Sequence, residues 1–321
     1  MAQHDTIRGE SVEFESEGTR CAASLYRPRE PATTDAENPP VVVMANGFGL
    51  PRWCGLPAFA ERFAERGLAV LVFDYRSIGE SDGEPRNVAL PFAQIADWRA
   101  AVEYARTIDG VDGNRIGVWG FSLGGGGAFV TAARENVDAC VGQTPIFDGG
   151  RTLLYIVRQM GPTYGLRTTA AGLRDAARKY TRQDPYYIPI WGDYPDELPA
   201  LPPPGSKEGH EAVVGTDANN EELNDNEELN RCAARAFLTF GRYRPIKEAT
   251  NVDCPTLVVE ATHDQIAPGS AIEATVSRLT DVSWVSYETD HFGAFFGDLF
   301  EEVVDREGAF LKRHLIGLTG P

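Results

Sequence analysis

The pentapeptide Gly120-Phe121-Ser122-Leu123-Gly124 constrains the fold of this chain more than any other feature. It follows the apolar run Ile116-Gly117-Val118-Trp119 and precedes a segment rich in small residues, 125–134. A strand, a sharp turn that carries a serine and a helix together form a nucleophile elbow. Glycines are expected on both sides of the serine, because a side chain there would collide with the neighbouring strand or helix.

The predicted elbow exposes the hydroxyl of Ser122. The first amides of the following helix, and the positive end of its dipole, face the space above that hydroxyl, where an oxyanion would form. A glycine-rich phosphate cradle is the competing interpretation of residues 124–127. No Lys-Ser or Lys-Thr follows them, and no acidic residue ends a strand about 20 residues further on. The pattern therefore favours acyl-transfer chemistry.

Strands alternate with helices along most of the chain. A hairpin is predicted at 11–15 and 21–26, and continuous apolar runs predict buried strands at 41–45, 68–73, 116–119, 139–143, 255–260 and 282–287. Helical spacing of apolar residues predicts helices at 56–66, 95–108, 125–134, 269–279 and 295–315. The order predicts an α/β fold with a mostly parallel central sheet and an antiparallel hairpin at its start.

This alternation stops between about residues 147 and 252. The segment instead holds helical pieces at 152–160 and 170–180, a stretch rich in proline and aromatic residues, and an acidic run at 208–228. We predict a helical lid over 148–252, inserted between two parts of one core, 1–147 and 253–321.

A serine hydroxyl needs a base, and the base needs a carboxylate that orients it. His291 follows the last predicted strand, and Asp264 follows the strand before it, so both are expected at the sheet edge where Ser122 emerges. The chain order Ser, Asp, His is typical of a nucleophile elbow fold. A surface histidine and a helix-capping aspartate are the plainer alternatives, and Asp148 is a reserve acid.

Two backbone N–H groups are expected to bind the oxyanion. One is that of Leu123, directly after the serine, and the other is that of Phe48 in the loop Asn46-Gly47-Phe48-Gly49 after the first parallel strand. An ordinary glycine turn is the alternative interpretation of this loop.

These motifs together resemble the α/β-hydrolase superfamily, in particular serine esterases similar to dienelactone hydrolases and acetyl xylan esterases. The residues that carry the resemblance are Asn46-Gly47-Phe48-Gly49, Phe73-Asp74-Tyr75-Arg76, the elbow, Asp264 with Pro268, and His291. Members often have His-Gly where this chain has Asn46-Gly47. We expect Asn46 to support the loop by hydrogen bonds instead.

The predicted activity is cleavage of a small carboxylic ester through an acyl-enzyme, with no metal and no organic cofactor. A serine peptidase and an acyltransferase would use the same three residues, and a non-catalytic binding protein on the same fold is a further alternative. The substrate pocket is predicted from large side chains, mostly of the lid, which alternatively form the lid's own core: Trp53, Tyr155, Met160, Tyr186, Tyr187 and Trp191.

The chain carries a net charge of −17, and only four of its 30 basic residues are lysines. This balance argues against nucleic acid as a partner. An acidic surface poor in lysine suits a high-salt environment, which we favour over the alternative of an acidic protein from a GC-rich genome. A stability that rises from low to molar KCl is the expected sign of halophily.

The first forty residues contain no apolar segment typical of a signal peptide, and no run approaches the roughly 18 apolar residues that span a bilayer. We therefore expect a cytoplasmic protein that does not bind membranes. The five scattered cysteines are expected to be reduced packing residues without a zinc site. The sequence leaves a monomer and a homodimer equally open.

Overall fold

The computed structural model describes residues 7–29, 38–216 and 228–317. Within these residues an eight-stranded sheet has the order β1-β2-β4-β3-β5-β6-β9-β10. Its strands are β1 (Glu10–Ser16), β2 (Thr19–Tyr26), β3 (Pro40–Ala45), β4 (Ala69–Phe73), β5 (Asp112–Phe121), β6 (Ala139–Gln143), β9 (Thr256–Ala261) and β10 (Val282–Tyr287). β1 and β2 pair antiparallel to their neighbours, and all other pairs are parallel. The predicted fold class is confirmed.

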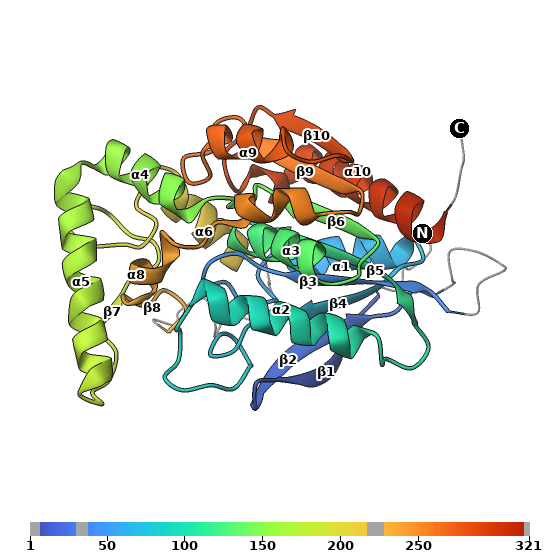
Figure 1. The fold of residues 1–321 in the computed structure, drawn as a ribbon, viewed down its shortest axis with the longest axis horizontal. Helices are drawn as coiled ribbons and strands as arrows, with labels where there is room; N and C mark the ends of the chain where they lie inside the picture. The colour runs from blue at the N-terminus through green and yellow to red at the C-terminus, as the bar shows by residue number, and fades with distance from the viewer. Residues whose placement is uncertain (1–6, 30–37, 217–227, 318–321) are drawn as a thin grey trace.

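Helices cover both faces of this sheet (Figure 1). α2 (Pro91–Ala105), α3 (Leu123–Arg134) and α9 (Gly269–Val276) pack on one face, and α1 (Leu56–Glu65) and α10 (Gly297–Ile316) pack on the other. Successive side chains of β3 belong to the hydrophobic cores on opposite faces of the sheet. Val41 and Val43 are in the core that contains Trp98, whereas Val42 and Met44 are in the core that contains Phe59. Both faces of the strand are therefore buried, which explains its unbroken apolar sequence.

The segment between β6 and β9 is mainly helical. It holds α4 (Gly149–Met160), α5 (Pro162–Tyr180), α6 (Ser206–Val214), α8 (Ala236–Phe240), the 3₁₀ helix η1 (Pro245–Asn251), and the short antiparallel pair β7 (Tyr187–Ile188) and β8 (Cys232–Ala233). Figure 1 shows α4, α5 and α8 gathered at one end of the sheet. Part of the acidic run, 217–227, lies outside the described residues. The division into 1–147, 148–252 and 253–321 stays a prediction.

Several elements extend beyond their predicted ends. α2 starts at Pro91 and α5 at Pro162, because proline at the first helical position needs no backbone hydrogen bond there. In α5 the hydroxyls of Thr168 and Thr169 donate to the carbonyls of Tyr164 and Gly165, four residues earlier, so these polar side chains are satisfied within the helix. The first turns of α5 carry no apolar stripe from which the sequence could predict them. The last predicted helix is divided into η2 (Gly293–Phe295) and α10.

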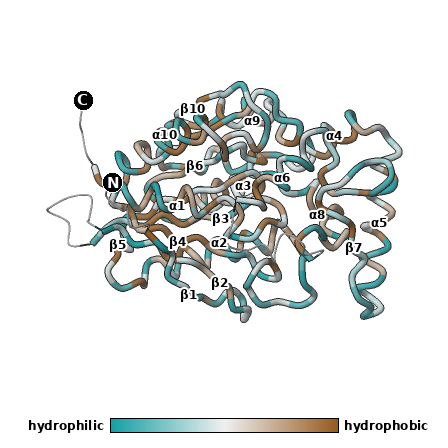
Figure 2. Tube along the Cα trace, turned by 180° about the vertical axis from the view of Figure 1, so that it is seen from behind, coloured by the Kyte–Doolittle hydropathy of each residue, from teal (hydrophilic) through white to brown (hydrophobic). Residues whose placement is uncertain are grey.

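The hydrophobic residues lie mainly inside this layered structure. Figure 2 shows hydrophobic colouring along the central strands and mixed colouring along the outer helices. All five cysteines are buried, as expected of packing residues. Among the described residues, no helix is long and apolar enough to cross a membrane.

Candidate active site

Ser122 occupies a strained turn between β5 and α3. Its backbone has φ 55° and ψ −118°, in the left-handed region that disfavours residues with a side chain. The turn is fixed from both sides, since Ser122 N donates to Gln143 O at 2.9 Å and Ile146 N donates to Ser122 O at 2.9 Å. A Cβ at Gly120 would overlap the Gly124 carbonyl, and a Cβ at Gly124 would overlap the Asn46 carbonyl. These close approaches are the reason for both glycines.

Ser122, His291 and Asp264 form one chain of hydrogen bonds. His291 Nε2 lies 2.9 Å from Ser122 Oγ, and His291 Nδ1 lies 2.6 Å from Asp264 Oδ2. All three residues are buried, with only 4–6% of their surface exposed. Low exposure strengthens such bonds, because water neither competes for the partners nor screens the charges. The structure brings together the three residues predicted from the sequence.

The carboxylate of Asp264 is fixed by the turn that carries it. Its second oxygen, Oδ1, accepts hydrogen bonds from Ile266 N and Ala267 N, both at 2.7 Å. The hydroxyl of Tyr155 on α4 donates to the Asp264 carbonyl at 3.1 Å. These bonds fix the turn and leave Oδ2 to orient His291. The helix-capping alternative for Asp264 is wrong, because α9 begins at Gly269 after Pro268 and has no side-chain cap.

The reserve acid Asp148 lies in a different environment. Its Oδ1 caps α4 by accepting from Gly150 N and Arg151 N, and its Oδ2 forms an ion pair with Arg244 at 2.8 Å. Both oxygens are therefore engaged away from His291. In the loop of His291, Asp290 Oδ1 accepts from Phe292 N at 3.0 Å, which stabilises the turn.

The loop after β3 lies directly against the elbow. A Cβ placed on Gly47 would lie 3.1 Å from Ser122 Cβ. Asn46 holds this loop, since its Nδ2 donates to Pro51 O at 3.0 Å and Cys54 O at 2.8 Å while its Oδ1 accepts from Gly47 N at 2.9 Å. The side chain expected to replace the missing histidine thus supports the loop.

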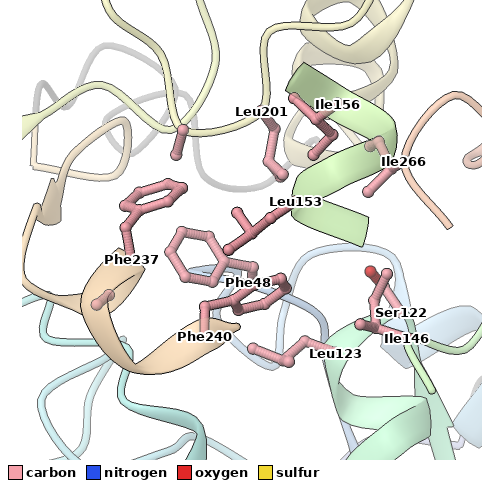
Figure 3. A pocket seen from close by; sticks show the side chains of 12 residues that line it. Phe48, Ser122, Leu123, Ile146, Leu153, Ile156, Leu201, Phe237, Phe240 and Ile266 are labelled. Atoms are coloured by element: carbon pink, nitrogen blue, oxygen red, sulfur yellow. The ribbon is translucent and has the colours of Figure 1, made fainter. Parts of the chain in front are cut away.

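Leu123 is the first residue of α3, so its amide has no acceptor within the helix. Phe48 and Leu123 both line a cavity that also reaches Ser122 (Figure 3). This arrangement is compatible with the predicted pair of oxyanion donors, whose role stays a prediction.

The cavity beside Ser122 has a volume of about 440 Å³ including its mouth. Its walls come from the core of the protein and from α4 and α8 of the inserted segment. In Figure 3, Ser122 lies at one side and Phe237 at the other, with Phe48 and Leu153 between them. Apart from Ser122 the lining is apolar: Phe48, Leu123, Ile146, Leu153, Ile156, Ala200, Leu201, Ala236, Phe237, Phe240 and Ile266.

None of the six large side chains predicted for the substrate pocket is among these lining residues. Tyr155 supports the Asp264 turn, as described above. Tyr186 lies under the guanidinium of Arg174, with 4.1 Å from the Arg174 Cζ atom to the ring centre, and the Tyr187 hydroxyl donates to the Arg86 carbonyl at 2.9 Å.

The other three lie elsewhere as well. The ring of Trp191 stacks on that of His210 with centroids 5.2 Å apart, and Trp53 and Met160 are partly buried outside the cavity lining. These six side chains therefore pack outside the cavity, and the residues of α4 and α8 that line it are Leu153, Ile156, Ala236, Phe237 and Phe240. Apolar residues on a helix give no sequence signal that separates the lining of a pocket from the packing of a core.

A further histidine, His210 on α6, is buried near the site. Its ring contacts Phe292, the neighbour of His291, with centroids 4.5 Å apart, and its Nδ1 lies 2.6 Å from Ser206 O. Burial lowers the pKa of His210 to about 4. The residue is therefore neutral near pH 7 and packs as an aromatic ring. The part of the chain that the structure describes contains no group of three His, Cys, Asp or Glu side chains arranged to hold a metal.

The sheet order, the elbow and the site geometry define the class of protein, an α/β hydrolase. The chain belongs to the X-Pro dipeptidyl-peptidase (S15) family, whose profile matches residues 17–285. The family and the fold confirm the resemblance found in the sequence, and the chain is a hydrolase.

Individual relatives agree with this assignment. The quorum-quenching protein AidA of Acinetobacter baumannii is 34% identical over 304 residues, which cover 94% of each chain. The polyketide transferase af380 of Aspergillus fumigatus is 28% identical over 283 residues, which cover 86% of this chain and 90% of that protein. The crystal structure of the α/β hydrolase GrgF from a Penicillium species has a TM-score of 0.75 at 22% identity and covers 96% of this chain and 99% of its own.

Proposed function

We propose that this protein hydrolyses carboxylic esters with apolar acyl groups through an acyl-enzyme formed on Ser122. The observation that carries the proposal is the hydrogen-bonded chain from Ser122 Oγ through His291 to Asp264, at the wall of an apolar cavity. A serine hydroxyl becomes a nucleophile when a base of this kind takes its proton.

In the proposed reaction, Ser122 Oγ attacks the ester carbonyl carbon while its proton moves to His291 Nε2. The tetrahedral oxyanion accepts hydrogen bonds from the amides of Phe48 and Leu123. Breaking the bond between the carbonyl carbon and the alcohol oxygen releases the alcohol, which takes the proton from His291. Water then attacks the acyl-enzyme, His291 removes its proton, and the acid leaves as Ser122 regains its hydrogen. The carboxylate of Asp264 stabilises the imidazolium that forms in both halves.

The apolar cavity supports the acyl side of this substrate assignment. An acyl chain bound beside Phe48, Leu153 and Phe237 would be removed from water. This burial would stabilise the complex by about 25 cal/mol per Å² of apolar surface. None of the lining residues is charged, so the cavity offers no partner for the free amine of a dipeptide. We therefore favour ester hydrolysis over peptidase activity, although the family takes its description from an X-Pro dipeptidyl-peptidase.

Acyl transfer is the second candidate, and it is favoured by the relative named as a polyketide transferase. The same acyl-enzyme would pass its acyl group to an alcohol instead of water. The two activities differ only in which acceptor reaches the carbonyl carbon.

The test is hydrolysis of p-nitrophenyl esters with acyl chains of increasing length, beside the p-nitroanilides of dipeptides. We expect the esters to be cleaved, the anilides to resist, and Ser122→Ala to reduce ester turnover by at least about 10³-fold. The matched control is Ser283→Ala, which changes an exposed serine on β10 and should preserve full activity. Adding acceptor alcohols reveals transfer as new ester products. Full turnover by Ser122→Ala would refute the proposal.

A further inference from the structure

A second, narrower pocket adjoins His291, with about 200 Å³ of unfilled space when the open solvent at its mouth is included. Its lining includes His291, Phe292, Ser206, Gln265 and Asp290. It shares Ile266 with the apolar cavity but none of the other lining residues. The hydrogen-bonded pair of Ser122 and His291 therefore has an apolar space on the serine side and a more polar space on the histidine side.

Ser206 carries an unmatched polar group in this second pocket. Only 3% of its surface is exposed, and its hydroxyl has no hydrogen-bond partner among the described residues. Its backbone is satisfied, because Ser206 N donates to Pro203 O at 3.0 Å and Ser206 O lies 2.6 Å from His210 Nδ1. Buried hydroxyls in folded proteins are nearly always hydrogen-bonded. The Ser206 hydroxyl therefore lies at the wall of the pocket with its hydrogen-bonding capacity unused.

The chemistry of ester cleavage indicates which part of the substrate enters this space. His291 Nε2 must give its proton to the alcohol oxygen as the bond between that oxygen and the carbonyl carbon breaks. The departing alcohol therefore leaves along His291, whereas the acyl group stays on Ser122 beside the apolar cavity. A pocket lined by His291 on the histidine side is the natural place for the alcohol.

The charges around the pocket restrict the kind of alcohol. Asp290 and Gln265 are exposed at its rim, and Glu208 lies in the first turn of α6, the helix that starts at Ser206. The carboxylate of Asp290, which lines the pocket, disfavours an anion there. At the buried end, the Ser206 hydroxyl and the positive end of α6 favour an oxygen that accepts a hydrogen bond.

We propose that this pocket binds the leaving group, and that Ser206 selects neutral alcohols that carry a second oxygen near the ester bond. The inference rests on the proposed ester hydrolysis and deepens it. The preferred substrate then has two unlike halves, an apolar acyl chain and a neutral, oxygen-bearing alcohol.

The test compares two butyrate esters that differ by one group, 2-hydroxyethyl butyrate and propyl butyrate. Ser206→Ala should lower kcat/KM for the 2-hydroxyethyl ester about tenfold and change that for the propyl ester less than twofold. Ser206→Thr, which keeps a hydroxyl, should retain most of the wild-type ratio of the two kcat/KM values. Turnover of the propyl ester by each variant shows that its site is intact.

The possible failures are distinguishable. If the wild-type protein cleaves neither these esters nor the p-nitrophenyl esters, the proposed hydrolysis itself fails, and this inference fails with it. If it cleaves the p-nitrophenyl esters but neither butyrate ester, the leaving-group inference alone is overturned. If the wild type cleaves both and Ser206→Ala changes neither rate, or changes both by the same factor, the leaving-group inference alone is overturned. That result would be expected if water, and not the alcohol, were the partner of the Ser206 hydroxyl.

Discussion

At the scale of single residues, Glu307 is a buried carboxyl group that takes no part in the proposed chemistry. It lies on α10 against β5, the strand that leads to the elbow, and it is fully buried. Trp119 Nε1 donates to Glu307 Oε2 at 2.8 Å, while Oε1 has no partner within the described residues. Burial raises the pKa of Glu307 to about 8, so the folded protein keeps this group protonated near pH 7.

This raised pKa predicts a loss of stability as pH rises. The unfolded chain releases the proton near pH 4.5, the ordinary value, but the folded protein holds it up to about pH 8. Between pH 4.5 and about pH 8, the contribution of Glu307 to the free energy of unfolding falls by up to about 1.4 kcal/mol per pH unit. Above about pH 8 this contribution is constant, because the group is ionised in both states. Glu307→Gln keeps the acceptor for Trp119 and removes the titration.

The measurement is the urea midpoint of unfolding at pH 5.5 and pH 8.5. The wild type and the control Glu302→Gln, which changes an exposed residue of the same helix, should lose more stability over this interval than Glu307→Gln. Equal losses in all three proteins would contradict a protonated Glu307.

The sequence predicted some single residues well and others not at all. Ser122, Asp264 and His291 could be placed together because each follows a strand of one parallel sheet, whose carboxyl ends share an edge. Ser206 and Glu307 had no such signal. A serine in an irregular segment and a glutamate in an amphipathic helix look exposed until the packing around them is known.

At the scale of elements, the apolar cavity depends on two helices of the inserted segment. α4 contributes Leu153 and Ile156, and α8 contributes Ala236, Phe237 and Phe240. The core contributes Phe48 and the elbow. Under the proposed function, α4 and α8 would shape the acyl site while the elbow and the turns of Asp264 and His291 carry the chemistry. α4 also contacts the second group, because Tyr155 donates to the Asp264 carbonyl.

Two adjacent leucines of α4 test this division. Leu153 lines the cavity, whereas Leu154 is 49% exposed. Leu153→Ala should widen the cavity and raise the ratio of kcat/KM for p-nitrophenyl octanoate to that for the acetate several-fold, because the longer chain gains space. Leu154→Ala should leave the ratio unchanged. The same ratio in both variants would show that the acyl group binds elsewhere.

The elements themselves were predicted unevenly. The buried parallel strands were found because both of their faces are covered, which makes their sequences continuously apolar. α5 was half missed, since its first turns carry glycine and threonines and little apolar periodicity. β7 and β8 are two residues each, too short for any alternating pattern to reveal them.

At the scale of the whole molecule, the excess of acidic residues is partly matched by arginines that join distant segments. Arg62 on α1 and Arg66, just after its end, pair with Glu301 and Asp305 on α10. Arg52 joins the loop after β3 to Asp74 after β4. The buried pair of Arg52 and Asp74 holds two loops close to the elbow. The exposed pairs contribute little at ordinary ionic strength, so adaptation to high salt stays a prediction.

The proposed function depends on one reactive serine, Ser122, and covalent labelling tests that proposal most directly. After incubation with a fluorophosphonate probe, the intact mass of the wild-type protein should increase by one phosphonyl group, located by peptide mapping on the peptide that contains Ser122. Ser122→Ala should keep its unlabelled mass under the same conditions. A wild-type protein that stays unlabelled, or a Ser122→Ala variant that is labelled to the same extent, would contradict the central claim.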